Sequence, residues 1–348
     1  MMGSLENLLA QGSSGVFIIA ELSANHNGSL QNALDTIKAA KRTGANAIKF
    51  QTFTPDTITL DAKTDDFLLK QGTLWDGKYL HDLYKEGYTP WEWHAELFNA
   101  AKNEGLVCFS TPFDKSSVDF LETLDTPAYK IASFEITDIP LIEYVASKNK
   151  PIIISTGIAE LEDIQLAVDA CKKQGNDQIA LLKCTSSYPA PIEEADLIMI
   201  KDLADRFGVI AGLSDHTMGI TAPIVATTLG AAIIEKHFII DRSIGGPDAS
   251  FSLNEEEFTN MVTAVREAKK AVGKIDYTLT EKQKKGREFS RSLYVTQDVK
   301  AGDIITDANV RSVRPGYGLH PKYLPEILGR TFTKDANKGM RFEWEMLG

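Results

Sequence analysis

Short apolar runs recur along most of the chain, and each is followed by a loop and a segment with helical periodicity. Because these runs are mostly apolar throughout rather than alternating in polarity, they are predicted to be strands buried on both faces, as in parallel sheets. Eight strand–helix repeats match the repeat number and typical length, about 250 residues, of a (β/α)8 barrel. The sequence therefore predicts an α/β fold, a TIM barrel spanning residues 16–275. The eight predicted strands are Val16–Glu21, Ala47–Gln51, Val107–Thr111, Ala128–Ile131, Ile152–Ser155, Ile179–Cys184, Val209–Ser214 and Ile233–His237.

The main alternative is an open, doubly wound sheet. Such a sheet ordinarily carries a glycine-rich phosphate loop after its first strand, with the pattern GxGxxG or GxxxxGK[ST]. Neither pattern occurs in this chain, and the first predicted strand runs instead into the polar loop Glu21–Gly28. The closed barrel is therefore favoured.

The chain beyond the eighth strand indicates a second, smaller domain. Residues Asn254–Gly273 are predicted to form a last long helix, and residues 276–289, rich in Lys, Glu and Gln without apolar periodicity, a linker. Residues 290–348 are expected to form a small β-rich domain with a marginal core that docks on a larger surface. Residues 1–15 are expected to be a loose lead-in. The β-like pieces of the small domain are Ser292–Val295, Asp303–Ile305 and Val310–Val313.

Charge and cysteine content limit the partners and the compartment. The 37 basic and 48 acidic residues give 37 − 48 = −11, which argues against nucleic acid or an anionic membrane as the main partner. An anionic substrate must then be held by a local basic pocket. No apolar run approaches the roughly 20 residues of a membrane span, and the first residues lack the pattern of a signal peptide. Three cysteines (Cys108, Cys171, Cys184) without CxxC spacing favour the reducing cytoplasm over a disulfide scaffold or a zinc cluster.

Polar residues stand at the end of nearly every predicted strand. In a parallel barrel the active site is built from these ends and the loops that follow them. Any single one of these residues is explained equally well as a donor or acceptor for loop backbone. Their convergence from eight strands instead predicts one active site. The residues are Glu21, Lys49, Gln51, Ser110, Thr111, Lys130, Ser133, Ser155, Thr156, Thr185–Ser187, Ser214, Asp215, His216, Glu235 and His237.

Two lysines, Lys49 and Lys130, interrupt apolar strands. A buried ammonium is costly unless an anion meets it, so the pair suggests a phosphorylated or carboxylated substrate. The serines at the neighbouring strand ends are candidates for neutral donors to the same anion. Two alternatives stay open: the lysines pair with core carboxylates such as Glu21 or Glu235, or one of them forms a Schiff base.

Two histidines, His216 and His237, close strands seven and eight, which are neighbours in a barrel. Two imidazoles with water and substrate oxygens suit a divalent ion such as Mn²⁺ or Fe²⁺. No further ligand stands at zinc-like spacing, and structural histidines are an equally good explanation of the pair. His26 is a possible further contact, and His94 is interpreted as packing or as part of a wall facing the substrate.

These motifs together resemble the sialic acid synthase family, whose members condense phosphoenolpyruvate with an amino-sugar aldehyde to form nonulosonic acids. The resemblance extends from Val16 to Leu347 and identifies the small domain with the family's antifreeze-like (SAF) domain. The motifs that carry it are Glu21-Leu-Ser-Ala-Asn-His-Asn-Gly28, Ala47-Ile-Lys-Phe-Gln51, Ser110-Thr-Pro-Phe-Asp114, Tyr129-Lys-Ile-Ala-Ser133, Ser155-Thr-Gly157, Leu213-Ser-Asp-His216, Glu235-Lys-His-Phe238, Gly246-Pro-Asp248 and Arg314-Pro-Gly-Tyr-Gly318.

The resemblance also implies roles for individual residues. Glu21 is expected to act at the sugar carbonyl, and His216 with His237 to hold Mn²⁺. Asp248 and Arg314 are expected to contact the sugar, with Arg314 arriving from the partner subunit of a domain-swapped homodimer. The residues expected around phosphoenolpyruvate are Lys49, Thr111, Lys130, Ser133, Ser155, Ser186 and Ser214, with Gln51 and Tyr188 nearby.

Within the family, the stretches Trp75–Tyr84 and Thr89–His94 look like the pseudaminic acid synthase branch, and Ser186 stands where sialic acid synthases commonly carry Asn. The expected sugar is then 2,4-diacetamido-2,4,6-trideoxy-L-altrose, with apolar walls supplied by the aromatic residues of the insertion after strand two. The alternatives are a sialic or legionaminic acid synthase, a Schiff-base barrel aldolase, and a carbohydrate-binding protein without catalysis. The aromatic residues in question are Trp75, Tyr79, Trp91 and Trp93.

Overall fold

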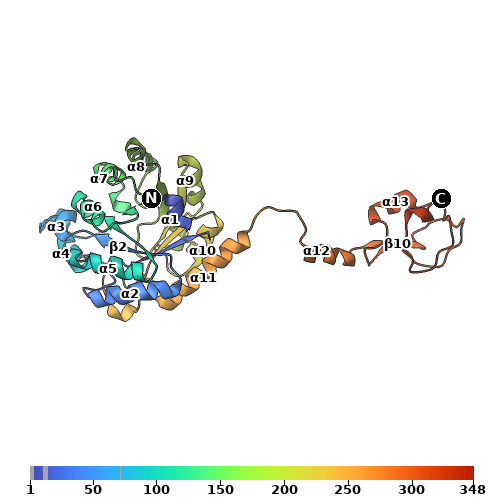
Figure 1. Ribbon diagram of the computed structural model, residues 1–348, viewed down its shortest axis with the longest axis horizontal. Helices are drawn as coiled ribbons and strands as arrows, with labels where there is room; N and C mark the ends of the chain where they lie inside the picture. Colours follow the sequence, from blue (N-terminus) through green and yellow to red (C-terminus); the bar gives the residue numbers. More distant parts are fainter. Residues whose placement is uncertain (1–3, 11–14, 71) are drawn as a thin grey trace. The chain divides into compact units, whose positions relative to one another are not determined.

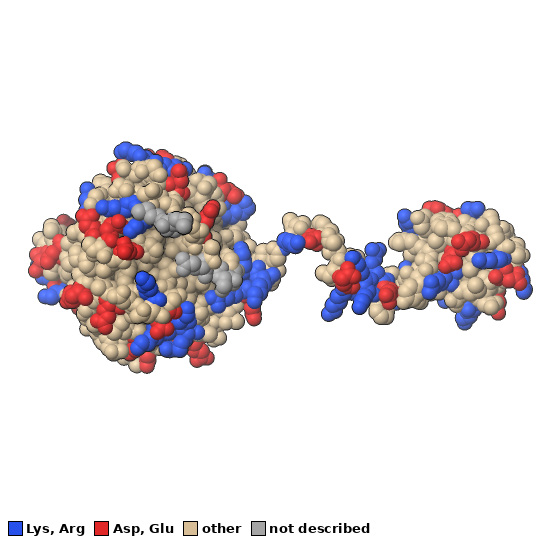
Figure 2. All heavy atoms as spheres, in the orientation of Figure 1, with Lys and Arg blue, Asp and Glu red and all other residues tan. Residues whose placement is uncertain are grey.

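The computed structural model describes residues 4–10, 15–70 and 72–348. The chain divides into two compact units, Met1–Gly273 and Lys274–Gly348. In the face shown in Figure 2, acidic and basic side chains are interspersed over the first unit. Within the described residues, no helix is both long enough and apolar enough to cross a membrane. All three cysteines are free and buried.

The first unit is a closed barrel of eight parallel strands, which confirms the predicted fold class (Figure 1). The strands are hydrogen-bonded in sequence order, and the predicted boundaries agree to within one residue. They are β1 (Phe17–Glu21), β2 (Ala47–Thr52), β3 (Val107–Pro112), β4 (Tyr129–Ile131), β5 (Ile152–Ser155), β6 (Ile179–Cys184), β7 (Ile210–Asp215) and β8 (Ile233–His237).

Helices surround the barrel and bury its outer side chains. The helix predicted over Asn254–Gly273 is α11 (Glu255–Val272), which begins one residue later because Asn254 is its N-cap and forms a capping box with Glu257. The long insertion after β2 adds α3 (Pro55–Ile58) and α4 (Leu80–Gly87). The remaining helices of the barrel wall are α2 (Leu30–Thr43), α5 (Trp91–Asn103), α6 (Lys115–Glu122), α7 (Ile139–Ala146), α8 (Leu161–Lys173), α9 (Met199–Phe207) and α10 (Thr221–Thr228).

Side chains that face the barrel interior are apolar at the strand starts and polar at the strand ends. Phe17 and Ile19 of β1 belong to the same buried cluster as Ala47, Phe109 and Ile233 of other strands. Because side chains alternate along a strand, the same inward columns continue to the polar residues at the carboxyl ends. The strand pattern thus places an apolar floor beneath a polar chamber.

A short helix at the amino terminus, α1 (Leu5–Ala10), covers the floor of the barrel. Leu5 and Leu8 are buried and belong to the same cluster as Phe17 and Ile19. The segment expected to be a loose lead-in therefore contains an ordered helix with a packing role. Its residues 1–3 and 11–14 lie outside the described part of the chain.

The second unit has its own small core around an antiparallel pair, β9 (Ser292–Val295) and β10 (Val310–Val313). The prediction of a β-like piece at Asp303–Ile305 is wrong, because Ile304 makes only an isolated bridge to Thr331. Part of the expected linker is helical: α12 (Glu281–Gly286) has a capping box at Thr280 and no buried residue. A last short helix, α13, spans Leu324–Ile327. Basic side chains gather over α12 in Figure 2.

Replacing Leu8 of α1 with Ala is expected to lower the free energy of unfolding of the barrel by about 2 to 5 kcal/mol, because it leaves a cavity against the barrel floor. The matched control is Asn7→Ala, at an exposed position of the same helix. Urea unfolding of both variants measures the difference. Equal stability of Leu8→Ala and Asn7→Ala would show that α1 does not support the barrel.

Candidate active site

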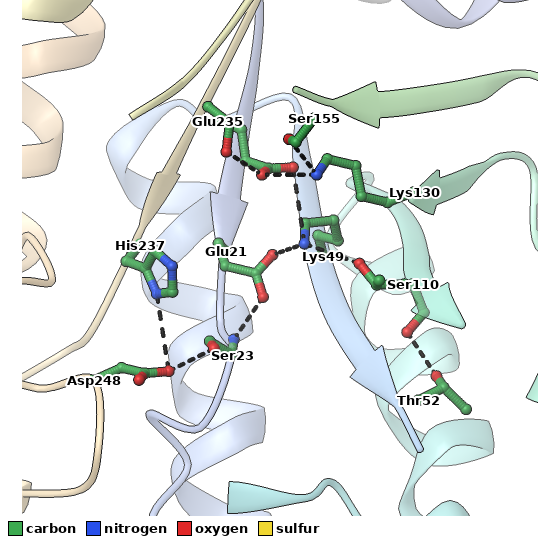
Figure 3. Close-up of polar contacts among 12 residues, drawn as sticks. Glu21, Ser23, Lys49, Thr52, Ser110, Lys130, Ser155, Glu235, His237 and Asp248 are labelled. Atoms are coloured by element: carbon green, nitrogen blue, oxygen red, sulfur yellow. Dashed lines mark hydrogen bonds and ion pairs between the residues drawn. The ribbon is translucent and has the colours of Figure 1, made fainter. Parts of the chain in front are cut away.

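Four charged side chains meet at the carboxyl ends of the strands (Figure 3). Lys49 Nζ contacts Glu21 Oε2 and lies 3.8 Å from Glu235 Oε2. Lys130 Nζ lies 3.5 Å from Glu235 Oε1. All four side chains are no more than 6% exposed. The two lysines thus do pair with core carboxylates, and the cluster has no net charge when all four groups are ionised.

Hydroxyl groups complete the coordination of this charge cluster. Lys49 Nζ donates to Thr111 Oγ1 at 3.1 Å, and Lys130 Nζ donates to Ser155 Oγ at 2.6 Å. Ser214 Oγ donates to Glu235 Oε1 at 2.9 Å. These hydroxyls come from β3, β5 and β7, and the charged groups come from β1, β2, β4 and β8, so side chains of seven of the eight strands reach the chamber.

The two carboxylates of the cluster differ in their protonation. Burial raises the pKa of Glu21 to about 7, although Lys49 acts in the opposite direction. Burial also opposes ionisation of Glu235, but Lys130 and Lys49 bring the pKa of Glu235 below its usual value. Glu235 therefore stays charged at neutral pH, whereas Glu21 is able to take up or release a proton there.

A second group of hydroxyls lies beside the lysines, around Gly157. A Cβ at Gly157 would lie 2.2 Å from Ser186 Oγ and 2.5 Å from Ser133 Oγ, so any larger residue would displace both hydroxyls. Ser133 Oγ is buried and has no hydrogen-bond partner in the structure. This donor is available to a ligand. Gly157 belongs to the Ser155-Thr-Gly157 motif. The sequence does not show that a side chain at this position would meet Ser133 and Ser186; the structure does.

His216 and His237 lie side by side, with ring centroids 5.3 Å apart. His216 Nδ1 donates to the carbonyl oxygen of Thr185 at 2.9 Å, which leaves a lone pair on Nε2 when the ring is neutral. His237 Nδ1 is buried without a hydrogen-bond partner, and burial holds the pKa of His237 well below its usual value. Burial also acts to lower the pKa of His216, but Cys184 raises the pKa of that ring above its usual value, so His216 must release a proton before both rings can bind a metal. In the described residues no three His, Cys, Asp or Glu side chains gather as a metal cluster.

Asp248 is held at the rim by the loop after β1. Its Oδ2 accepts from Ser23 Oγ at 2.5 Å and from the backbone N–H of Ala24 at 3.2 Å, and it lies 4.0 Å from His237 Nδ1. Ser23 is a residue that sequence reasoning missed. Tyr188 lies across the rim, with its ring 4.3 Å from His216 and 5.7 Å from Trp75.

A cavity of about 560 Å³ opens above these residues. One part of its lining consists of polar groups predicted from the sequence, and another part is an apolar wall from the insertion after β2. Glu135 also lines the cavity; burial raises the pKa of Glu135 to about 7, and its Oε2 has no hydrogen-bond partner. This residue was missed, although its position two residues after Ser133 was a signal. The predicted residues on the lining are Gln51, Ser133, Ser186, Tyr188, His237 and Asp248.

Most of the aromatic wall expected from the sequence lies elsewhere. Trp75 lines the cavity, and its Nε1 donates to the carbonyl oxygen of Pro247 at 3.3 Å. Trp91 stacks on Phe120, Trp93 packs edge-on against His26, and Tyr79 lies under the ammonium of Lys63. The apolar wall consists instead of Phe53, Ile58, Leu69, Leu80, Leu83 and Phe113.

Two further histidine candidates lie outside the chamber. His26 is buried, and its Nδ1 accepts from the backbone N–H of Gly28, so it stabilises its own loop. His94 is packed in the wall: its Nδ1 donates to the carbonyl oxygen of Pro90, and its Nε2 accepts from Thr52 Oγ1 at 2.9 Å. Arg314 belongs to the second unit, where it is exposed.

Comparisons with known proteins find relatives along almost the whole chain. Residues 36–277 match the NeuB family model, and residues 290–347 match the SAF domain. Pseudaminic acid synthase of Campylobacter jejuni is 50% identical over 93% of this chain and 94% of that protein. The enzyme of the same name from Helicobacter pylori is 47% identical, over 91% and 93%. The crystal structure of N-acetylneuraminic acid synthetase from Leptospira borgpetersenii superposes with a TM-score of 0.70 and 31% identity, covering 78% of this chain and 90% of that one.

The buried histidine His94 predicts how stability depends on pH. Burial lowers the pKa of His94 to about 4, below its ordinary value of 6.5. As the pH falls from 6.5 towards 4, the unfolded chain therefore binds a proton at His94 that the native state does not. The free energy of unfolding then falls by up to about 1.4 kcal/mol per pH unit for this group.

His94→Gln should lower stability at neutral pH but reduce this loss on acidification. Urea unfolding at about pH 7, 6 and 5 measures both effects. The exposed His320, replaced by Gln, is the control that should leave the slope unchanged. A slope identical to that of the wild type in His94→Gln would contradict the assignment of a neutral, buried imidazole.

Proposed function

The chain belongs to the NeuB family, and on that premise we propose that it is a pseudaminic acid synthase. In this proposal it is a transferase that condenses phosphoenolpyruvate with 2,4-diacetamido-2,4,6-trideoxy-L-altrose and releases phosphate. The observation that carries the proposal is the pair of buried lysines near the unpartnered hydroxyl of Ser133, at the base of a cavity with polar groups on one side and an apolar wall on the other. A small dianionic or trianionic substrate fits such a base, and a larger, partly apolar one fits the cavity above it.

Phosphoenolpyruvate would bind at Lys49 and Lys130, with further donors from Ser133, Ser155 and Ser186. In the ligand-free cluster the two lysines are neutralised by Glu21 and Glu235. Protonation of Glu21, whose pKa is raised to about 7, gives the cluster a net positive charge and favours the anion. Fixed donors around both anionic groups then lower the barrier by positioning and electrostatics.

In the reaction, carbon 3 of phosphoenolpyruvate attacks the aldehyde carbon of the sugar, and a carbon–carbon bond forms. Glu21, from its place at the rim of the charge cluster, supplies the proton that the new alkoxide takes up. Water adds at the electron-poor carbon 2 and returns one proton to Glu21; its second proton passes to the departing phosphate as the bond between carbon 2 and the phosphate oxygen breaks, which leaves the keto acid and hydrogen phosphate. The lysines and serines hold the phosphate as it leaves.

His216 and His237 are proposed to hold a divalent metal, with Mn²⁺ as the expected ion. The adjacent imidazoles, with His237 Nδ1 buried without a hydrogen-bond partner, fit such an ion once His216 is deprotonated, and water and substrate oxygens would fill its other positions. When bound, the metal would polarise the aldehyde oxygen as a Lewis acid. Asp248, at the same rim, is placed to accept a hydrogen bond from a sugar hydroxyl.

The apolar wall is the feature that favours the 6-deoxy sugar. Its side chains from β2, β3 and the insertion suit a methyl group at carbon 6 and the methyl groups of two acetamido substituents. A hydroxyl at carbon 6 would lose its water there without gaining a partner, at about 1 to 3 kcal/mol. A sialic or legionaminic acid synthase is the alternative within the family.

Phosphate release with a panel of aldoses tests the proposal. The altro-configured 2,4-diacetamido-2,4,6-trideoxy sugar is expected to give a kcat/KM at least about 10-fold above that of N-acetylmannosamine or the manno-configured diacetamido sugar. Leu83→Asn, on the apolar wall, should narrow the ratio to N-acetylmannosamine, which has a hydroxyl at carbon 6, more than the ratio to the manno-configured sugar, which has the same methyl groups as the altro sugar. The control is Leu74→Asn, an exposed leucine of the same insertion that does not line the cavity.

Comparable kcat/KM for N-acetylmannosamine would refute the pseudaminic assignment, and no phosphate release with any aldose would favour a non-catalytic carbohydrate-binding protein. A Schiff-base aldolase is the other alternative, because burial lowers the pKa of Lys130. Borohydride would then trap the carbonyl substrate on the protein, whereas the condensation proposed here leaves the lysines unmodified.

The second unit is proposed to complete the site of a partner subunit in a domain-swapped homodimer, with Arg314 contacting the sugar in trans. Arg314 is exposed, and it lies in a glycine-flanked loop of a unit joined through exposed linker residues. Mixing inactive Arg314→Ala chains with inactive Lys49→Ala chains should restore part of the activity, because one site of the mixed dimer has both residues. Exchange of subunits without any regained activity would place Arg314 in cis or outside the site.

A further inference from the structure

A second pair of opposite charges, Asp215 and Lys236, lies on the outer side of the barrel wall, directly behind the chamber. Both belong to motifs that carry chemistry, Leu213-Ser-Asp-His216 and Glu235-Lys-His-Phe238, yet neither has a role in the proposed reaction. Ser214, Glu235 and His237 face inward, so the alternation of side chains turns Asp215 and Lys236 outward. The two residues are direct partners in the β7–β8 register, and each side chain is only 1% exposed.

The ammonium of Lys236 ties the strand end to the loop that carries His216. Lys236 Nζ contacts Asp215 Oδ2 and donates to the carbonyl oxygen of Thr217 at 2.6 Å. Asp215 Oδ1 accepts from the backbone N–H of Thr217 at 2.9 Å. The residues on both sides of His216 are therefore held by one side chain, which comes from the position just before His237.

His216 itself is held from the opposite side by the loop after β6. Its Nδ1 donates to the carbonyl oxygen of Thr185, and its own carbonyl oxygen accepts from the backbone N–H of Ala190 at 2.9 Å. These contacts orient the ring but leave the distance between the ends of β7 and β8 to be set by other groups. The Asp215–Lys236 pair joins those two strand ends by side chains on the outer side, as Ser214 and Glu235 do on the inner side.

We propose that Asp215 and Lys236 are positioning residues that hold the imidazoles of His216 and His237 at the separation a shared divalent metal requires. A fully buried ion pair is weak evidence for stability, because apolar residues of similar volume often stabilise a protein equally well. Its directional contacts to both flanks of His216 suit the pair to fixing geometry instead. The inference rests on the metal site of the proposed function.

The test measures Mn²⁺ affinity without any substrate, by titration calorimetry on the full-length protein. Lys236→Met alone leaves a buried carboxylate without its partner and is expected to unfold the barrel. Asp215→Asn alone would likewise leave a buried ammonium without its partner, so the deciding variants are the neutral double variants Asp215→Asn/Lys236→Met and Asp215→Leu/Lys236→Met. Both are expected to bind Mn²⁺ about 10- to 100-fold more weakly than the wild type while remaining folded.

Ser110→Ala is the matched control. Ser110 is fully buried on the outer side of β3, where its Oγ lies 2.6 Å from Thr52 Oγ1, away from both histidines. This variant should lower the melting temperature but leave the Kd for Mn²⁺ unchanged.

The outcomes separate this inference from the proposed function. A wild type that binds no Mn²⁺ would remove the metal site and the positioning role with it. A wild type that binds Mn²⁺, with an unchanged Kd in the folded variants, would leave the metal site standing and overturn the role of Asp215 and Lys236. Failure of both variants to fold would assign the pair to the stability of the barrel and would likewise overturn the proposal.

Discussion

The mutual neutralisation of Lys49, Lys130, Glu21 and Glu235 is the interaction on which the site depends. Each of these groups would be prohibitively costly to bury alone, and each finds its partner on another strand. The partners come from β1, β2, β4 and β8, so closure of the barrel between β1 and β8 is what brings them together. The chamber therefore depends on closure of the barrel, since an open sheet would leave its terminal strands and their charges apart.

Much of this arrangement was predictable from the sequence because the barrel is a repeat. A continuous apolar run bounded by a polar residue identifies both a strand and the end that faces the chamber, which located Lys49, Lys130, His216 and His237 without any structure. Features without periodicity were not predictable in the same way. The six residues of α1 are too few to show a helical pattern, and the packing of Trp91 and Trp93 depends on which face of α5 meets the barrel. The need for glycine at position 157 comes from the hydroxyls that surround it in space, which the sequence does not show.

The insertion between β2 and β3 gives the chamber a second part, whose chemistry differs from that of the strand ends. Charged and hydroxyl groups on the strands form a rigid base, whereas the apolar wall comes largely from α4 and the loops around it. Residues of the insertion are therefore able to change without disturbing the ion pairs below. This separation explains why substrates of different shape are compatible with the same set of strand-end residues.

The packed floor beneath the charge cluster also limits where molecules can enter and leave the chamber. Apolar side chains fill the lower barrel and α1 covers them, and in the described part of the chain the cavity lies at the carboxyl ends of the strands, where Ser133 and Ser186 belong to its lining. A molecule that reacts at the lysines must pass the rim before the space above it is filled. Under the proposed function, the deeper reactant would enter first, and an occupant of the upper cavity would block its exit.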